Sequence, residues 1–263
     1  GFRYSVGVAL SDDKAKVVSY PSNPTNKIGD GVLYKGYTVG DIWGYVTGGI
    51  LQEGDFDGVG ANGKPLYHGP YFKGGQAYPG YIWYQDLDHD GVITTGLNTV
   101  DDPGDRKVIG NNAPRYRYNI TANFQYKGFD LDLMFQGVGK RDYWLSSTSS
   151  YWGNGAGSWE VYNNSWTPER TDAKFPMYGS GTGSYPQTGY LLDASYIKLK
   201  QVILGYTFPR ALINKIGLEK LRLNLAAYNL FTISDMPKYY DADYLSDAYP
   251  PKRTFSVGIQ VGF

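Results

Sequence analysis

Apolar and polar residues alternate with a period of two along three parts of the chain, as they do in a β-strand with one apolar face. The longest part covers residues 116–136 and is interrupted only by Lys127 and Gly128. A two-residue link between alternating runs is typical of a tight hairpin, so we expect two antiparallel strands here. The other two parts are residues 221–228 and 255–263.

The apolar face of the expected hairpin has aromatic residues near its ends. It consists of Tyr116, Tyr118, Ile120, Ala122, Phe124 and Tyr126 on one strand and Phe129, Leu131, Leu133 and Phe135 on the next. The strands of a sandwich would be shorter, about five or six residues. Runs of about ten alternating residues with terminal aromatics are typical of a transmembrane barrel, whose outer side contacts lipid. The expected fold is therefore all-β, an antiparallel transmembrane β-barrel segment.

The connections between these strands differ in length. Lys127-Gly128 is a short turn, whereas the stretches at about 51–80 and 138–190 are long, polar and rich in glycine, serine, asparagine and tryptophan. The usual connection in a compact domain has only about 4 to 6 residues. Short turns at one end of the strands and long loops at the other indicate an outer-membrane barrel. In the segment 209–217, Pro209 and Gly217 predict the start and end of a helical turn.

Composition narrows the classes of partner. The chain has 25 basic and 25 acidic residues, so it lacks the basic surface that nucleic acid requires. It has no cysteine, which excludes disulfides and thiolate metal sites. No stretch approaches the roughly 18 consecutive apolar residues of a membrane-spanning helix. The 26 tyrosines exceed what a core needs, and the interfacial girdles of a barrel would accommodate them.

The first ten residues, GFRYSVGVAL, already alternate and contain neither an initiator methionine nor a signal peptide. We therefore expect the chain to be a piece of a longer protein. A sheet that ends in lipid would leave unpaired N–H and C=O groups, each costing several kcal/mol, so a barrel segment also requires the rest of its barrel.

Eight blocks of sequence resemble the carboxy-terminal portion of SusC/RagA-type TonB-linked outer-membrane proteins. They occur in the order of that family and span nearly the whole chain, which makes the set more specific than any single motif. The blocks are GYTVGDIWGYVTGGILQ (36–52), PGYIWYQDLDHDGVI (79–93), DRKVIGNNAPRYRY (105–118), YKGFDLDLMFQGVGK (126–140), SWTPE (165–169), SYIKLKQVILGYTFP (195–209), LRLNLAAYNLFTISD (221–235) and YPPKRTFSVGIQVGF (249–263).

The resemblance implies that residues 1–263 are the last third to half of a TonB-dependent barrel of about 22 strands. The plug domain and the first strands would be absent from this chain. At about 25 residues per strand and connection, about ten strands are expected. The resemblance further implies a bacterial outer-membrane importer of oligosaccharides or peptides, energised by TonB through the missing amino-terminal region and covered by a SusD-like surface lipoprotein.

The segment DLDHDGV, residues 86–92, matches the start of a calcium-binding loop. Its three aspartates occupy positions 1, 3 and 5 of the D-x-D-x-D-G pattern, and Gly91 supplies the turn at position 6. Position 12 holds Leu97, so the loop lacks its usual last carboxylate. We expect the chain to bulge out over residues 94–104 and to return an acidic residue to the site.

The expected ligands of a structural Ca²⁺ are Asp86, Asp88, Asp90, the carbonyl oxygen of Val92, and Asp105. Asp101 or Asp102 could take the place of Asp105. The alternative is a surface turn in which the aspartate side chains hold only their own backbone.

Four tryptophans lie among glycines and serines in the long stretch 138–190, namely Trp144, Trp152, Trp159 and Trp166. Exposed aromatic rings on a loop can stack on sugar faces or contact a partner, and ligand contacts concentrate on loops. We expect these four residues to contact the ligand. The alternative is that the rings pack the loop onto itself or onto the barrel rim.

No catalytic constellation is found. His68 and His89 are the only histidines, and no G-x-S-x-G motif is present. We therefore expect a protein that is not an enzyme, and the family resemblance implies energised nutrient uptake as the leading function. The alternative functions are a secreted calcium-stabilised glycan-binding β-protein that uses the tryptophan loop, and a surface hydrolase.

Overall fold

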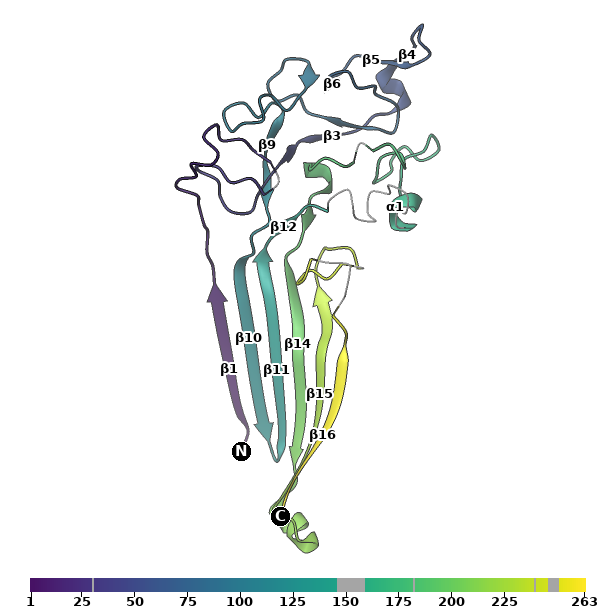
Figure 1. Ribbon diagram of the computed structural model, residues 1–263. Helices are drawn as coiled ribbons and strands as arrows, with labels where there is room; N and C mark the ends of the chain where they lie inside the picture. The colour runs from purple at the N-terminus through teal and green to yellow at the C-terminus, as the bar shows by residue number, and fades with distance from the viewer. Residues whose placement is uncertain (30, 146–158, 182, 239, 246–250) are drawn as a thin grey trace. The chain divides into compact units, whose positions relative to one another are not determined.

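The computed structural model describes residues 1–263 except for residues 30, 146–158, 182, 239 and 246–250 (Figure 1). The chain divides into two compact units, each built from separate stretches of sequence. Unit 1 comprises residues 1–14, 114–141 and 193–263, and unit 2 comprises residues 15–113 and 142–192. No helix among the described residues has the length and apolarity needed to cross a membrane.

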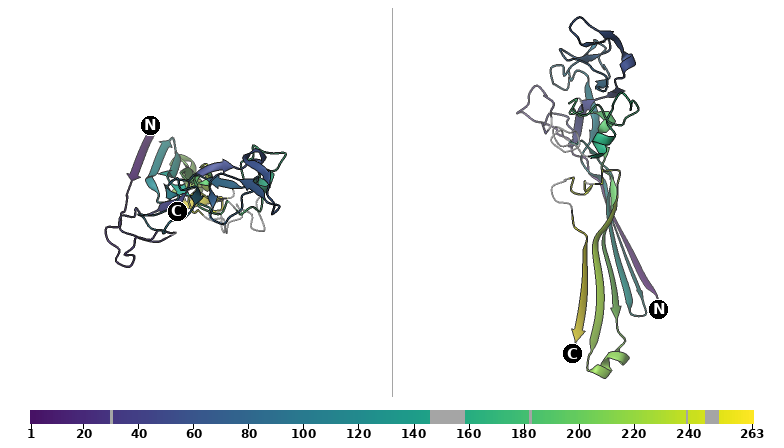
Figure 2. Two further views of the ribbon diagram at one scale, coloured as in Figure 1. Left: turned by 90° about the horizontal axis from the view of Figure 1, so that it is seen from above. Right: turned by 90° about the vertical axis from the view of Figure 1, so that its right-hand side faces the viewer.

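Unit 1 is a single antiparallel sheet of six long strands, each paired with the next long strand along the chain (Figures 1 and 2). In sheet order the strands are β1 (Arg3–Ser11), β10 (Arg115–Tyr126), β11 (Phe129–Lys140), β14 (Tyr196–Thr207), β15 (Lys220–Ile233) and β16 (Thr254–Gly262). The three predicted alternating regions all lie in these strands. The sequence prediction of long antiparallel strands is therefore confirmed.

The hairpin of β10 and β11 has the predicted turn and register. Lys127 and Gly128 both have positive φ, 45° and 89°, which suits a tight two-residue turn. Ile120 pairs with Phe135 and Phe124 with Leu131, so the apolar residues of the two strands share one face.

One face of the sheet is apolar and exposed across all six strands. The edge strands show this most clearly, since Tyr4 and Val8 are each 69% exposed and Val257 is 76% exposed. The long strands of unit 1 form a single layer in the described part of the chain (Figure 2). Soluble monomers rarely expose contiguous apolar patches larger than a few hundred Å², so this face is a contact surface for an apolar partner or for lipid.

A β-bulge interrupts β14 at Lys200. The register with both neighbouring strands shifts between Leu199 and Gln201. Because one extra residue reverses the alternation of a strand, Leu199 and Val202 lie on the same, apolar face. Strict alternation from Val202 would have placed Lys198 and Lys200 on that face as well, whereas both lysines contact carboxylates on the polar side.

Each edge strand has one neighbour in the described chain, β10 for β1 and β15 for β16. Unpaired edges of long strands are sites for pairing with further strands. The sheet therefore has two edges at which other strands of a barrel can be added.

The connections of the sheet alternate between short and long. The short ones are the Lys127-Gly128 turn and the link from β14 to β15, which contains α2 (Arg210–Ile213) and η3 (Asn214–Ile216). Gly217 follows with φ 76°, so the helical turn predicted for 209–217 is confirmed. The estimate of about ten strands was too high, because unit 2 lies in two of the long connections and contains more than half of the residues.

Unit 2 is a compact body of short strands and turns with its own core. Its elements are β2 (Asp41–Tyr45), β3 (Thr47–Ile50), η1 (Glu53–Asp55), β4 (Phe56–Val59), β5 (Pro65–Tyr67), β6 (Tyr71–Phe72), β7 (Ile82–Tyr84), β8 (Val92–Ile93), β9 (Arg106–Asn111), β12 (Asp142–Tyr143), α1 (Trp159–Asn163) and η2 (Thr188–Tyr190), while β13 (Leu192–Asp193) lies at its end. Ile82, Ile93 and Phe175 are buried in it.

The two stretches of unit 2 are fastened to each other by hydrogen bonds. The indole Nε1 of Trp166 donates to Oε1 of Gln52 at 2.9 Å, and Nε2 of Gln187 donates to the hydroxyl of Tyr84 at 3.0 Å. Tyr84 is 1% exposed and belongs to a group of buried tyrosines, with Tyr34, Tyr37, Tyr45 and Tyr190. The sequence analysis assigned the excess of tyrosine to the interfacial girdles alone, and the core of unit 2 accounts for part of it instead.

Candidate functional site

The aspartates of the 86–92 segment form a closely packed turn. Carboxylate oxygens of Asp86, Asp88 and Asp105 all lie within 4.8 Å of one another. Asp86 also accepts hydrogen bonds from the backbone N–H groups of His89, at 2.7 Å, and Gly91, at 2.8 Å. Three converging carboxylates provide the hard oxygen ligands that Ca²⁺ prefers.

Asp105 returns to this turn at the end of the 94–104 excursion. The residue is fully buried, and its two oxygens accept hydrogen bonds from the backbone N–H groups of Leu87, at 2.8 Å, and Thr94, at 2.7 Å. Its carboxylate thus joins the two sides of the aspartate turn. The excursion is closed by Gly96 and Gly104, whose backbones approach so closely that a Cβ on either would clash.

The other two expected ligands are placed differently. Asp90 is exposed, and its Oδ1 accepts a hydrogen bond from the backbone N–H of Val92 at 2.8 Å. Val92 begins β8, which pairs in parallel with β6. Asp90 does not belong to the group of converging carboxylates, so the geometry groups Asp105 with Asp86 and Asp88 and leaves Asp90 outside.

The carboxyl groups of the turn differ in their proton affinity. Burial raises the pKa of Asp86, but the hydrogen bonds from Gly91 and His89 outweigh it, and the pKa is lowered overall. Burial also raises the pKa of Asp88, and the neighbouring charges of Asp105 and Asp90 raise it further. A bound cation would relieve the repulsion that Asp105 and Asp90 exert on Asp88.

The predicted tryptophans have different surroundings. Trp159, at the start of α1, is 76% exposed, and its ring meets that of Tyr162 edge to face at 5.9 Å. Tyr162 in turn contacts Tyr178 at 5.7 Å, so three exposed rings lie together. Trp166 is only 3% exposed and bonded to Gln52, which favours the packing alternative for that residue. Trp144 is half-buried, and Trp152 lies outside the described residues.

The polar face of the sheet carries ion pairs between strands. Arg222 on β15 contacts Asp130 on β11 across the intervening strand β14. The bridge passes over Gly205, where any Cβ would meet both side chains. At the start of β10, Arg115 pairs with Asp12, and this hydrogen bond is the main cause that lowers the pKa of Asp12 to about 2. The polar face is thus lined by charged side chains that hold one another.

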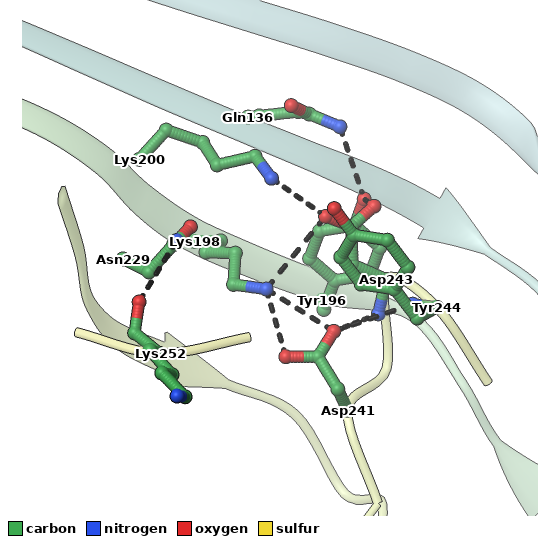
Figure 3. Close-up of polar contacts among 9 residues, drawn as sticks. All are labelled: Gln136, Tyr196, Lys198, Lys200, Asn229, Asp241, Asp243, Tyr244 and Lys252. Carbon is green, nitrogen blue, oxygen red and sulfur yellow. Dashed lines mark hydrogen bonds and ion pairs between the residues drawn. The ribbon is translucent and has the colours of Figure 1, made fainter. Parts of the chain in front are cut away.

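A cluster on β14 holds part of the connection from β15 to β16 (Figure 3). Nζ of Lys198 lies 2.8 and 3.1 Å from the two carboxylate oxygens of Asp241, and Nζ of Lys200 lies 2.8 Å from Asp243. The hydroxyl of Tyr196 donates to Asp243 at 2.6 Å. We call residues 240–245, which include both aspartates, the strap.

The charges of this cluster are largely removed from water. The side chain of Lys198 is 2% exposed and that of Asp241 is 11% exposed. Burial raises the pKa of Asp243, but the hydrogen bonds from Lys200 and Tyr196 and the charges of both lysines outweigh it, so the pKa is lowered overall and the carboxyl is ionised at neutral pH. The ring of Tyr244 lies 5.7 and 5.8 Å from the two ammonium groups.

The sequence analysis did not identify this cluster. Tyr196, Lys198 and Lys200 occupy every second position of SYIKLKQ, opposite Ile197 and Leu199, so their common face could have been predicted. The Asp-Ala-Asp segment that meets them lies about 40 residues further on, and sequence spacing does not reveal that contact.

Curated relatives of the chain are TonB-dependent receptors. TonB-dependent receptor P3 of Formosa agariphila is 28% identical over the whole chain, which covers 27% of the receptor. TonB-dependent receptor P39 of the same organism is 23% identical, with 100% of the chain and 28% of the receptor covered. TonB-dependent receptor SusC of Bacteroides thetaiotaomicron is 26% identical over 83% of the chain and 23% of the receptor. The chain thus spans about a quarter of the length of these relatives.

Solved structures with the same fold are transporters. The RagAB peptide transporter superposes with a TM-score of 0.62 at 17% identity, covering the whole chain and 27% of the transporter chain. The RagAB peptide importer in its closed-closed state gives a TM-score of 0.63 at 16% identity, with the same coverage. No family model matches the chain.

Proposed function

Because the chain is homologous over its full length to the carboxy-terminal part of TonB-dependent receptors, we propose that it forms part of the wall of a SusC/RagA-type nutrient importer. TonB-dependent receptors reside in the bacterial outer membrane and are not enzymes. The observation that carries the proposal is the exposed apolar face of the six-stranded sheet, with charged side chains on the opposite face. Such a sheet fits between lipid and a water-filled lumen.

In this proposal the apolar face contacts lipid, and the two sheet edges pair with the remaining strands of one large barrel. The importer would take up oligosaccharides or peptides, draw energy from TonB through a plug outside this chain, and work with a SusD-like surface lipoprotein. The RagAB structures, which are of a peptide transporter, support cargo of the peptide class and a two-component assembly. Among the described residues, the exposed rings of Trp159, Tyr162 and Tyr178 offer aromatic contacts for cargo or lipoprotein.

A secreted calcium-stabilised glycan-binding protein is the second candidate, and the exposed apolar face counts against it. Cell fractionation distinguishes the two candidates, with the protein followed by a tag inserted beside Gly63 in an exposed turn of unit 2. The tagged full-length protein is expected to sediment with outer membranes, to resist alkaline extraction and to co-purify with a surface lipoprotein. Recovery of the protein in the aqueous fraction would refute the importer proposal.

We further propose that Asp86, Asp88 and Asp105 hold a Ca²⁺ ion that stabilises the 86–105 loop, with Asp90 and the carbonyl of Val92 as additional ligands. The converging carboxylates support this proposal. The ion would have a structural role, in which it rigidifies the loop.

Hydrogen exchange of residues 84–106 tests the calcium proposal. Adding Ca²⁺ to the full-length receptor is expected to slow exchange in this segment about tenfold or more, and a chelator is expected to reverse the effect. Asp88→Asn removes a ligand without disturbing the hydrogen bonds to Asp105, so it is expected to abolish the response. Asp57→Asn is the matched control, because Asp57 is exposed on β4, where it pairs with His68. An Asp88→Asn receptor that responds like the wild type would contradict the proposal.

A further inference from the structure

A cleft of about 640 Å³ lies beside the buried end of Lys198. It is bounded by the end of β15, the strap, and the two residues Pro251 and Arg253, which precede β16. The amide of Asn229 donates to the backbone carbonyl of Lys252 at 3.3 Å and fastens the last of these boundaries (Figure 3). The cleft belongs wholly to unit 1.

The lining of the cleft is positively charged. Three cations, Lys198, Lys238 and Arg253, face a single carboxylate, that of Asp241. Lys238 and Arg253 are exposed, and neither has an ion-pair partner in the described part of the chain. Phe231 and Tyr240 add aromatic surface. Uncompensated cations in a concave, partly apolar site favour an anionic ligand.

Asp241 forms the ion pair with Lys198 that the carboxylate of a ligand would form. Both of its oxygens contact Nζ, at 2.8 and 3.1 Å, in a site where Lys198 is almost completely buried. A buried ion pair contributes little net stability, because the cost of removing both charges from water offsets their attraction. A loop that needed only to be anchored could use apolar contacts at equal stability. The ion pair differs from such an anchor because another anion can compete for it.

We propose that this cleft binds an anionic group, a carboxylate, sulfate or phosphate, which pairs with Lys238 and Arg253 and competes with Asp241 of the strap for Lys198. The strap is then an internal competitor that keeps Lys198 neutralised when no ligand is bound. The inference rests on the proposed function, because a ligand reaches the polar face of the sheet only if that face lines an aqueous lumen. It adds to the proposed function that the cargo carries negative charge.

Calorimetric titration of the detergent-purified full-length receptor at low salt tests the site. The probes are the tripeptides Glu-Glu-Glu and Gln-Gln-Gln, which have the same backbone and differ in charge. The acidic probe is expected to bind about tenfold more tightly than the neutral one. In the double variant Lys238→Gln and Arg253→Gln, the affinity for the acidic probe is expected to fall about tenfold, with little change for the neutral probe.

Two further variants make the test specific. Asp241→Asn with Asp243→Asn removes the competing charges, so the acidic probe is expected to bind several-fold more tightly. Lys215→Gln with Lys252→Gln removes the same charge as the cleft variant from side chains outside the cleft, and is expected to leave the affinity unchanged. Equal binding of both tripeptides would overturn the assignment of the site to anionic cargo. An equal loss of affinity in the control and the cleft variant would overturn the inference that the cleft binds anions.

The phosphates of lipopolysaccharide are a second source of the same chemistry. Titration with purified lipopolysaccharide separates the two sources. If the cleft variant weakens binding of lipopolysaccharide and the tripeptides do not discriminate by charge, the cleft is an anion site for lipid phosphate and the cargo assignment is wrong. A receptor that sediments with outer membranes but fails every charge test refutes this inference alone, whereas recovery in the aqueous fraction refutes the proposed function.

Discussion

Replacing Ile120 by lysine is expected to prevent assembly of the receptor into the outer membrane. Ile120 lies at the middle of β10, on the apolar face, between Val8 and Phe135 on the neighbouring strands. A lysine that faces lipid at mid-membrane costs about 2 to 4 kcal/mol, a large fraction of the stability of a folded protein. The expected result is loss of the heat-modifiable band on a gel and loss of the protein from outer-membrane fractions.

Thr121→Lys is the matched control, because it adds the same charge one position further along the same strand. Thr121 pairs with Gly7 and is exposed on the polar side of the sheet. This variant is expected to assemble like the wild type. If the two variants assembled equally well, the apolar face would not contact lipid, and the importer proposal would lose its main structural support.

Replacing Asp105 by asparagine is expected to destabilise the 86–105 loop even without calcium. An asparagine retains only one acceptor oxygen, so the backbone N–H of either Leu87 or Thr94 would lose its partner. That N–H would instead face the NH2 group of the asparagine side chain, which is also a donor. An unsatisfied buried donor costs about 1 to 3 kcal/mol. In the presence of a chelator, hydrogen exchange at Leu87 and Thr94 is expected to accelerate about tenfold or more.

Asp101→Asn serves as the control for this experiment. Asp101 is exposed and was the alternative ligand in the sequence analysis, so its replacement removes the same charge from the same excursion. Exchange at Leu87 and Thr94 is expected to stay at the wild-type rate. Faster exchange in the Asp101 variant would instead indicate that the charge of the excursion, rather than the two hydrogen bonds of Asp105, stabilises the loop.

The sheet was predictable because its alternation is local. On β10, β11, β15 and β16 one apolar residue at every second position determines which face of the sheet is apolar, and the Lys127-Gly128 link determines the register of the hairpin. On β14 the bulge at Lys200 breaks the pattern, and no local signal in SYIKLKQVILG marks the extra residue. The reversal follows from pairing with two neighbours, which a single strand does not reveal.

Unit 2 was not predicted as a folded body. Its strands have two to six residues, too few for a clear period, and its core combines Tyr84 and Ile82 with Phe175, which lies about 90 residues further along the chain. The polar composition of residues 15–113 and 142–192 indicated loops, although both stretches contribute buried residues to the core. Contacts between distant segments are the part of a fold that periodicity does not show.

The aspartate site was partly predictable, because only some of its residues are close together in the sequence. The spacing of Asp86 and Asp88 is local, whereas the excursion of residues 94–104 had to be bridged by inference before Asp105 could be placed with them. The structure groups Asp105 with Asp86 and Asp88, and leaves Asp90 outside the converging carboxylates. The cluster of the strap with Lys198 was not predicted, because Lys198 and Asp241 lie about 40 residues apart in the sequence and only folding brings them together.

The hydrogen bonds that join Gln52 to Trp166 and Tyr84 to Gln187 have a consequence for chimeras between related receptors. Grafting residues 15–113 alone onto another scaffold would separate each donor from its acceptor and expose half of a shared interior. A transplant of residues 15–113 together with 142–192 would carry the complete body. We therefore expect related receptors to retain or exchange these two stretches together, even though two strands of the sheet separate them in the sequence.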